Sequence, residues 1–188
     1  MNMRVLIRVT CISLALALTG AVAADALTLG QTLDRGFLNE ERDIVPLIEA
    51  MPADKFNFAP TAGEFKGVRT FAQQAKHMAT VIYLMSSSIL EQKAPVDTGK
   101  SDAGPESLQT KQQIDVYVKG AFSFGHRALL SLTEKNQMDM VASAIGNGKQ
   151  ARIASAVFMM YHSYDHYGQM VEYLRMNGLI PPSTQQGR

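Results

Sequence analysis

The chain has 188 residues, of which 46% are hydrophobic, and a formal net charge of +1 at pH 7. This length is enough to bury one sizeable core, so we expect a single domain. The near-neutral charge excludes the strongly basic surface that nucleic-acid-binding proteins use to attract phosphates.

The first 23 residues have the pattern of a secretory signal peptide. Two arginines and no acidic residue precede a mostly apolar run over residues 9–18, and Ala21-Val22-Ala23 provides a small-residue cleavage site. The apolar run is too short for a confident membrane span. We therefore expect the mature chain to begin at Ala24 and to be exported, most simply to a bacterial periplasm.

Removal of this leader changes the composition in two ways. Cys11, the only cysteine, lies in the leader, so residues 24–188 contain no thiol, no disulfide and no cysteine-ligated metal. Loss of Arg4 and Arg8 leaves 16 basic against 17 acidic residues. We therefore expect neither nucleic acid nor an anionic lipid surface as a partner.

The mature chain is expected to form four helices, the first over residues 29–50. Its apolar residues recur with a helical period at Leu33, Phe37, Ile44 and Ile48. Pro46 predicts a kink or a break near the end of this helix, because proline lacks the backbone N–H group. Residues 52–66 have no helical period and are expected to form an ordered loop.

The second helix is expected to begin after Thr70, which forms a capping-box pattern with Gln73. An apolar stripe typical of a helix bundle follows at Phe71, Ala75, Met78, Ile82, Met85 and Ile89. His77 lies beside this stripe. Residues 91–106, which are rich in proline and glycine, are expected to form a polar connection at the surface.

The third helix is expected over residues 108–132, followed by a short helical piece over residues 137–145. Residues 147–150 have the pattern of a helix cap, and the fourth helix is expected to run from there to Asn177, ending at Gly178.

His162 and His166 lie four residues apart on the fourth helix, so their imidazoles share one face about one turn apart. They stand in the middle of an otherwise hydrophobic row between Met159 and Met170. Because a second apolar row runs through residues 153–174, we expect this helix to be largely enclosed.

Two adjacent buried histidines have two interpretations. Each can be a core residue bonded to a carbonyl or hydroxyl group, since an unpartnered buried polar group costs about 1–3 kcal/mol. Alternatively, both bind a divalent metal ion, for which imidazoles that are neutral at pH 7 offer lone pairs. A metal site needs a third protein ligand, and His77 can supply it if the second and fourth helices pack together. Three neutral nitrogens with open positions are typical of a catalytic site.

The sequence resembles the DinB/YfiT-like superfamily of metal-dependent four-helix-bundle proteins over nearly all of residues 24–188. The motifs that carry the resemblance are Met51–Pro60 after the first helix, Phe71–Ala79 in the second, His162-x-x-x-His166-x-Gly-Gln169 in the fourth, and Tyr173–Gly178 at its end.

This resemblance implies an all-α four-helix bundle in the order up-down-down-up. It also implies a divalent metal ion, commonly zinc or nickel, bound by His77, His162 and His166, and it makes a homodimer an expected form. Relatives include thiol-dependent transferases and amidohydrolase-like proteins, so we expect a metal-dependent hydrolase or transferase that acts on a small molecule. Thiol cofactors would be scarce after export, which disfavours a thiol transferase. The alternative is a non-catalytic periplasmic bundle that binds a metal or ligand.

Other residues near the histidines leave their roles open. Asp165 can be a general base or a partner of a ligand, but it points about 100° away from His166 on the helix, which favours a solvated or inter-helix salt bridge. Gln169 can orient a ligand or form a plain hydrogen bond between helices. His126 is a candidate fourth ligand and otherwise a packing or partly exposed residue. The nearby methionines suit copper as well as ordinary core packing.

Overall fold

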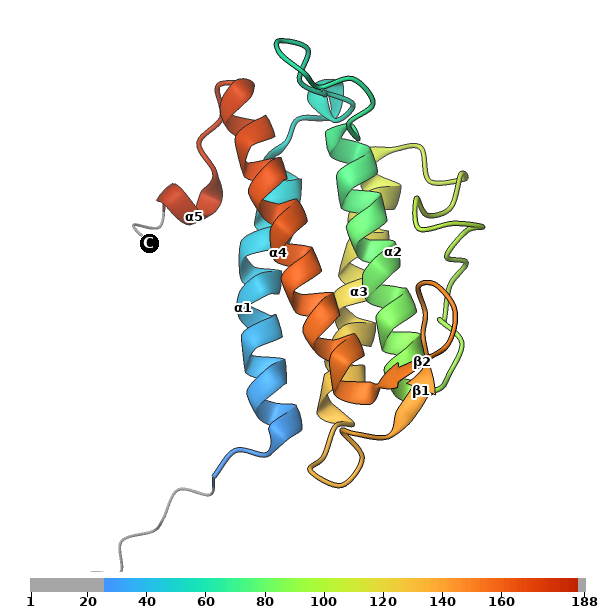
Figure 1. Ribbon diagram of the computed structural model, residues 1–188. Helices are drawn as coiled ribbons and strands as arrows, with labels where there is room; N and C mark the ends of the chain where they lie inside the picture. The colour runs from blue at the N-terminus through green and yellow to red at the C-terminus, as the bar shows by residue number, and fades with distance from the viewer. Residues whose placement is uncertain (1–25, 186–188) are drawn as a thin grey trace, which may run out of the picture.

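The computed structural model describes residues 26–185, which form four long helices that run side by side (Figure 1). The elements are α1 (Leu29–Ala50), the 3-10 helix η1 (Ala53–Lys55), α2 (Phe71–Leu90), α3 (Lys111–Leu130), β1 (Met140–Ala142), β2 (Lys149–Ala151), α4 (Arg152–Met176) and α5 (Pro182–Gln185). The leader expected over residues 1–23, with Cys11, and the expected new N-terminus at Ala24 lie outside the described residues. Within residues 26–185, none of the helices combines the length and hydrophobicity needed to span a membrane.

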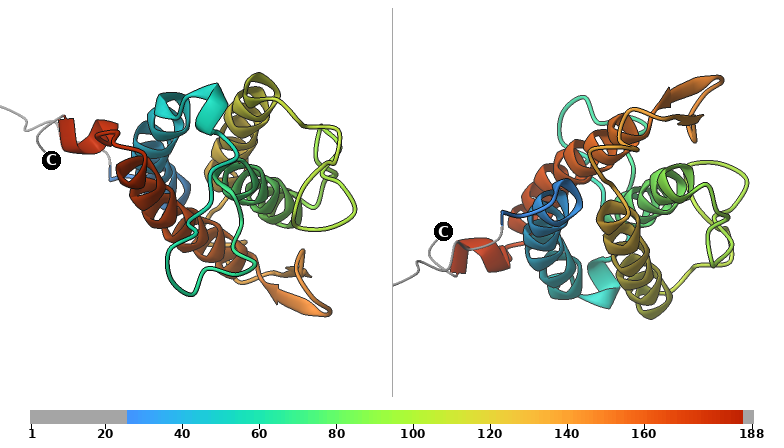
Figure 2. Two further views of the ribbon diagram at one scale, coloured as in Figure 1. Left: turned by 90° about the horizontal axis from the view of Figure 1, so that it is seen from above. Right: turned by 90° about the horizontal axis from the view of Figure 1, so that it is seen from below.

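The helices follow the expected up-down-down-up order, since α1 and α4 run in one direction and α2 and α3 in the other (Figure 1). Because α2 and α3 are parallel, residues 91–110 return along the bundle on the outer side of these two helices (Figures 1 and 2). Seen along the bundle axis, the four helices occupy four corners, with α2 packed against α3 and α4 (Figure 2). The second and fourth helices are therefore neighbours, as a shared histidine site requires.

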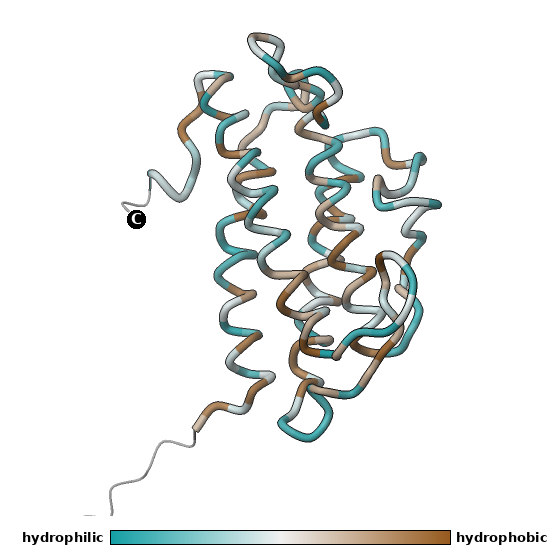
Figure 3. The backbone as a smooth tube through the Cα atoms, in the orientation of Figure 1, coloured by the Kyte–Doolittle hydropathy of each residue, from teal (hydrophilic) through white to brown (hydrophobic). Residues whose placement is uncertain are grey.

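One hydrophobic core fills the space between the helices. Phe37 of α1, Ile82 of α2, Phe122 of α3 and Met170 of α4 are completely buried. The rings of Phe37 and Phe122 lie 4.9 Å apart between centroids, and a Cβ atom at Gly125 would collide with the Phe37 ring. Along α1, hydrophobic and hydrophilic residues alternate in bands, as expected of an amphipathic helix (Figure 3).

Three of the long helices begin with the same capping box. Thr28, Thr70 and Thr110 each accept a hydrogen bond from the backbone N–H three residues ahead, where a glutamine side chain accepts in return from the threonine N–H. The next N–H groups of α2 donate to the carbonyls of Phe58 and Phe56 at 2.8 Å. The cap expected at Thr70 is confirmed, and the loop before α2 is ordered because it supplies these acceptors.

Pro46 does not break α1, which continues as one helix to Ala50. A proline removes the hydrogen bond that its own N–H would donate, here to the carbonyl of Arg42, and its ring crowds that carbonyl. Ile44 and Leu47, on either side of it, are completely buried. Packing of these side chains holds the last turns helical, so the expected break was wrong.

The segment before α4 is a β-hairpin, and the short helix expected over residues 137–145 was wrong. Strands β1 and β2 pair antiparallel, with Met140 opposite Ala151. Gly146 and Gly148 adopt positive φ angles in the connecting turn, a conformation that favours a tight reversal over a helix.

The start of α4 also differs from the cap expected over residues 147–150. The N-cap residue is Ala151, which offers no side-chain hydrogen bond. Instead, the first two N–H groups of α4 donate to the carbonyls of Asp139 and Gln137 at 2.9 Å. The hairpin backbone thus replaces a capping side chain.

One of the two apolar rows of α4 is enclosed only at its C-terminal end. Met159 and Met170 of the first row are completely buried. In the second row Val157 and Tyr164 are 49% and 41% exposed, whereas Val171 and Leu174 are buried. The prediction of a largely enclosed helix was therefore wrong for the part of the second row that precedes Val171.

Glu40, in the middle of α1, is a buried acid in this bundle. The residue is 1% exposed, and its Oε2 atom has no hydrogen-bond partner among residues 26–185. Burial raises the pKa of this carboxyl from 4.5 to about 9. The folded protein therefore keeps Glu40 protonated at neutral pH.

Replacement of Glu40 by glutamine should change how stability depends on pH. Between pH 4.5 and about 9 the folded state binds the Glu40 proton and the unfolded state does not, so the free energy of unfolding falls as pH rises, by up to about 1.4 kcal/mol per pH unit. The glutamine in Glu40→Gln cannot ionise, so this fall in the free energy of unfolding is absent from the variant. In urea unfolding, the free energy of unfolding of the variant minus that of the wild type should increase by more than about 1 kcal/mol between pH 5.5 and pH 8. Glu64→Gln, in an exposed loop, is the control, and an equal pH dependence in Glu40→Gln and wild type would contradict the assignment.

Candidate metal centre

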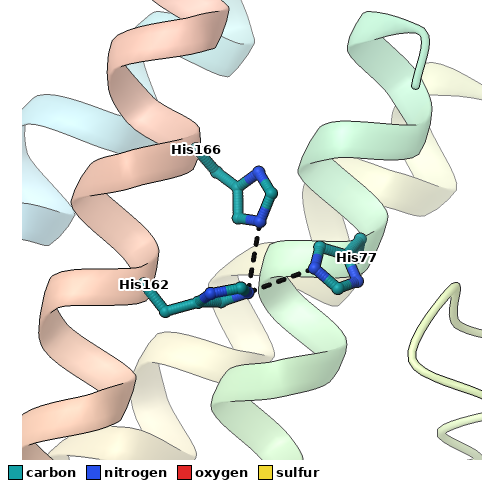
Figure 4. A group of neighbouring side chains, drawn as sticks. All are labelled: His77, His162 and His166. Atoms are coloured by element: carbon teal, nitrogen blue, oxygen red, sulfur yellow. Dashed lines mark hydrogen bonds between the residues drawn. The ribbon is translucent and has the colours of Figure 1, made fainter. Parts of the chain in front are cut away.

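His77 of α2 and His162 and His166 of α4 point their rings toward one another (Figure 4). The Nε2 atom of His162 lies 3.1 Å from Nε2 of His77 and 3.1 Å from Nε2 of His166. A zinc-like ion with bonds of about 2.0–2.1 Å separates two of its ligand nitrogens by about 2.9–3.4 Å, depending on the coordination angle. Both distances from His162 fall in this range, and the ligand nitrogens of all three residues lie within 4.8 Å of one another.

His77 is oriented from outside the bundle. Its Nδ1 atom lies 2.7 Å from the backbone carbonyl oxygen of Asp102, in the connection between α2 and α3. A carbonyl oxygen can only accept, so Nδ1 carries the proton and donates it. The Nε2 atom of His77 is left with a lone pair that faces the other two rings.

A chain of side-chain hydrogen bonds orients His166. It begins at the Asp165 carboxylate, which accepts from Nε2 of Gln169 at 3.0 Å. The Oε1 atom of Gln169 accepts from Nε2 of Gln74 at 2.7 Å, and Oε1 of Gln74 lies 2.5 Å from Nδ1 of His166. Because a carboxylate only accepts, each amide in the chain has one orientation, and Nδ1 of His166 carries the proton. We call this chain the amide relay.

These two orientations leave the cluster short of hydrogen-bond donors. With protons on Nδ1 of His77 and of His166, only Nε2 of His162 can carry a hydrogen among the three converging nitrogens. A single N–H group cannot make a full hydrogen bond to both neighbours. The His162 ring itself is held by stacking on Phe158, with the centroids 5.2 Å apart and the planes at 16°. Converging lone pairs of this kind are complemented by a cation.

Burial keeps the three imidazoles neutral. Burial, together with smaller contributions from the neighbouring His162 and His77 when charged, lowers the pKa of His166 to about 3. Burial likewise lowers the pKa of His77 and of His162 below the ordinary value of 6.5. At pH 7 all three rings are in the form that binds metals, so the group could hold a metal ion.

His126 lies outside this cluster. Its Nδ1 atom is 2.6 Å from Oδ1 of Asp34, and its Nε2 atom is 3.1 Å from Oε2 of Glu41. Both carboxylates belong to α1, so each ring nitrogen of His126 faces an acid oxygen of that helix. His126 therefore links α3 to α1 and offers no lone pair to the other histidines.

The residues that orient the site were predicted only in part. Gln169 combines both expected roles: its hydrogen bond to Gln74 joins two helices, and through Gln74 it helps to orient His166. Asp165 is exposed to solvent, as one of its expected alternatives has it, and it accepts from Gln169 on its own helix rather than forming an inter-helix salt bridge. Gln74 was missed, although its position three residues before His77 on the same helix could have drawn attention to it. The carbonyl of Asp102 was also missed, because a backbone acceptor leaves no signal in the sequence.

Comparison with known proteins gives the family. The sequence profile of the DinB family matches residues 28–188. The chain belongs to the DinB family. A search of curated proteins gives no match.

Solved structures similar to this DinB family member share its fold. A DinB-like protein from Bacillus cereus ATCC 10987 has 18% identity and a TM-score of 0.61, covering 79% of this chain and 95% of its own. A DinB-like protein from Bacillus subtilis has 20% identity and a TM-score of 0.59, with 78% and 92% covered. A conserved protein from Enterococcus faecalis has 15% identity and a TM-score of 0.63, with 80% and 97% covered. At these identities the likeness shows the fold alone.

The amide relay and the Asp102 carbonyl predict the tautomers of His166 and His77 in the metal-free protein. NMR of the ring nitrogens should find the proton of both His77 and His166 on Nδ1. Gln74→Leu removes the acceptor at similar volume, so His166 should lose this preference while His77 keeps it. Gln112→Leu, on the exposed side of α3, is the matched control. An unchanged His166 tautomer in Gln74→Leu would contradict the relay.

The position of His126 predicts a structural effect without an effect on metal content. An amide in place of the ring in His126→Gln leaves one of the two carboxylates without its partner, so the free energy of unfolding should fall by about 1 kcal/mol. Chemical denaturation measures this change, and elemental analysis should find the same metal content as in wild type. Metal loss in a correctly folded His126→Gln protein would show that this residue belongs to the centre.

Proposed function

We propose that this protein binds one divalent metal ion, zinc or nickel, through the Nε2 atoms of His77, His162 and His166, and that it is a metal-dependent hydrolase or transferase acting on a small molecule. One observation carries the proposal: Nε2 of His162 lies 3.1 Å from Nε2 of both His77 and His166, and fixed Nδ1 protons leave those two neighbours with lone pairs. The resemblance to a superfamily of metal-dependent proteins supports it.

The donor set favours a reactive ion over a structural one. Three neutral imidazoles leave at least one coordination position for another ligand. When bound, such an ion supplies Lewis-acid chemistry, polarising a carbonyl group or activating a water molecule. Asp102 and the amide relay would keep two of the rings in the ligating tautomer, because their acceptors hold the Nδ1 protons.

The surroundings of the cluster favour an enzyme over the alternative, a non-catalytic periplasmic bundle. His162 is only partly buried, and a cavity borders Gln74 and Gln169, the two glutamines that orient His166. A closed centre would have favoured a binding protein without turnover.

We further propose that residues 1–23 direct export and that the protein acts in the periplasm. The leader pattern supports this location, and the absence of cysteine from residues 24–188 suits an oxidising compartment. Because thiol cofactors would be scarce there, we favour a hydrolase over a thiol transferase. The homodimer remains a prediction from the resemblance.

Metal content tests the binding part of the proposal. Protein lacking residues 1–23, purified without an affinity tag, should contain about one zinc or nickel ion per chain by plasma mass spectrometry. His77→Ala and His162→Ala should lose the ion, because each removes one of only three ligands, whereas His126→Ala should retain it. A wild-type protein that stays empty after reconstitution with zinc and nickel would overturn the proposal.

Turnover tests the catalytic part. The metal-loaded protein should convert a member of a panel of esters, amides and thiol adducts. Chelation should abolish this activity and added metal should restore it. A loaded protein that converts nothing in the panel, while retaining its ion through the assay, would instead support the non-catalytic alternative.

A further inference from the structure

A polar cavity of about 620 Å³ lies beside the histidine cluster. This volume is within the range of about 300–1,000 Å³ that small-molecule sites occupy. Two of its lining residues, Gln74 and Gln169, belong to the amide relay that orients His166. The cavity is lined by Gly67, Val68, Arg69, Gln73, Gln74, Lys76, Ala103 and Gln169.

The charged residues of this lining are both basic. Arg69 and Lys76 contribute a guanidinium and an ammonium group, and the other lining side chains are amides or small apolar groups. A cavity with positive charge and amide donors on its wall selects for acceptors of hydrogen bonds that carry negative charge.

The Arg69 guanidinium has unused donors. Its side chain makes no hydrogen bond within residues 26–185, and its nearest ion-pair partner, Oδ2 of Asp102, lies 3.7 Å away, beyond hydrogen-bond distance. The side chain is 40% exposed, so a ligand can reach it. Lys76 donates one hydrogen bond to the carbonyl of Pro105 at 3.1 Å, which leaves two N–H groups of its ammonium available.

The backbone of Arg69 is fixed close to the histidines. Its carbonyl oxygen accepts a hydrogen bond from the Tyr173 hydroxyl of α4 at 3.1 Å. Asp102, which lies next to the Arg69 side chain, also orients His77 through its own carbonyl group. Positive charge is thus held beside the ligand set on the side where the cavity lies.

We propose that this cavity binds a small organic anion whose carboxylate or phosphate group is held by Arg69, assisted by Lys76. A guanidinium matches either acid group with two parallel hydrogen bonds. Gln73 and Gln169, which also line the cavity, then hold polar groups of the same molecule. This inference names the substrate class of the proposed metal site, and it rests on that proposed function.

Calorimetric titration of the purified, zinc-reconstituted protein tests the proposal, with succinate as the carboxylate probe and phenyl phosphate as the phosphate probe. At least one should bind, and the stronger of the two identifies the acid group. Arg69→Gln should weaken that probe at least tenfold, while Arg175→Gln, an exposed arginine paired with Glu172, should bind as wild type does. Circular dichroism and zinc content establish that Arg69→Gln is folded and loaded.

Three results would overturn the proposal. They are an equal affinity of wild type and Arg69→Gln, binding of neutral succinamide as tight as that of succinate, and binding of neither probe by zinc-loaded wild type. The same titration on metal-free protein separates this inference from the metal site. Arginine-dependent anion binding without any zinc uptake would refute the metal site alone, whereas zinc uptake without anion binding would refute the anion site alone.

Discussion

The packing of α2 against α4 is the contact on which the candidate centre depends. One ligand comes from α2 and two come from α4, so the three Nε2 atoms meet only when the two helices have the right register. The hydrogen bond from Gln74 to Gln169 crosses the same interface at 2.7 Å, and it sets the proton position on His166. Helix register and ligand orientation are therefore fixed by the same interface.

This arrangement has a cost that a cation offsets. Burial lowers the pKa of each imidazole, so the cluster cannot relieve its converging lone pairs by gaining protons at neutral pH. A metal ion that binds the folded state alone adds stability that grows with the logarithm of its concentration. Residues 91–110 would help to stabilise the metal-bound state, because this segment carries the Asp102 carbonyl group that orients His77. Metal binding and anion binding in the adjacent cavity would then act on one continuous site.

The sequence carried enough information for the bundle and for the three histidines, but not for what surrounds them. The capping box at Thr70 and the four-residue spacing of His162 and His166 are local patterns, so they could be interpreted without the fold. Gln74 and the Asp102 carbonyl acquire their roles only through contacts between distant segments. The hairpin was missed because its three-residue strands are too short for a period to emerge. Pro46 misled because packing of its neighbours outweighs one lost hydrogen bond.

X-ray absorption spectroscopy of the zinc-loaded protein tests the central claim most directly, because it reports the atoms bound to the ion. The account predicts about three imidazole nitrogens at about 2.0–2.1 Å with at least one oxygen ligand, and fewer imidazole ligands around any zinc that His162→Ala still retains. A spectrum dominated by oxygen, or one unchanged in His162→Ala, would contradict a centre built from His77, His162 and His166.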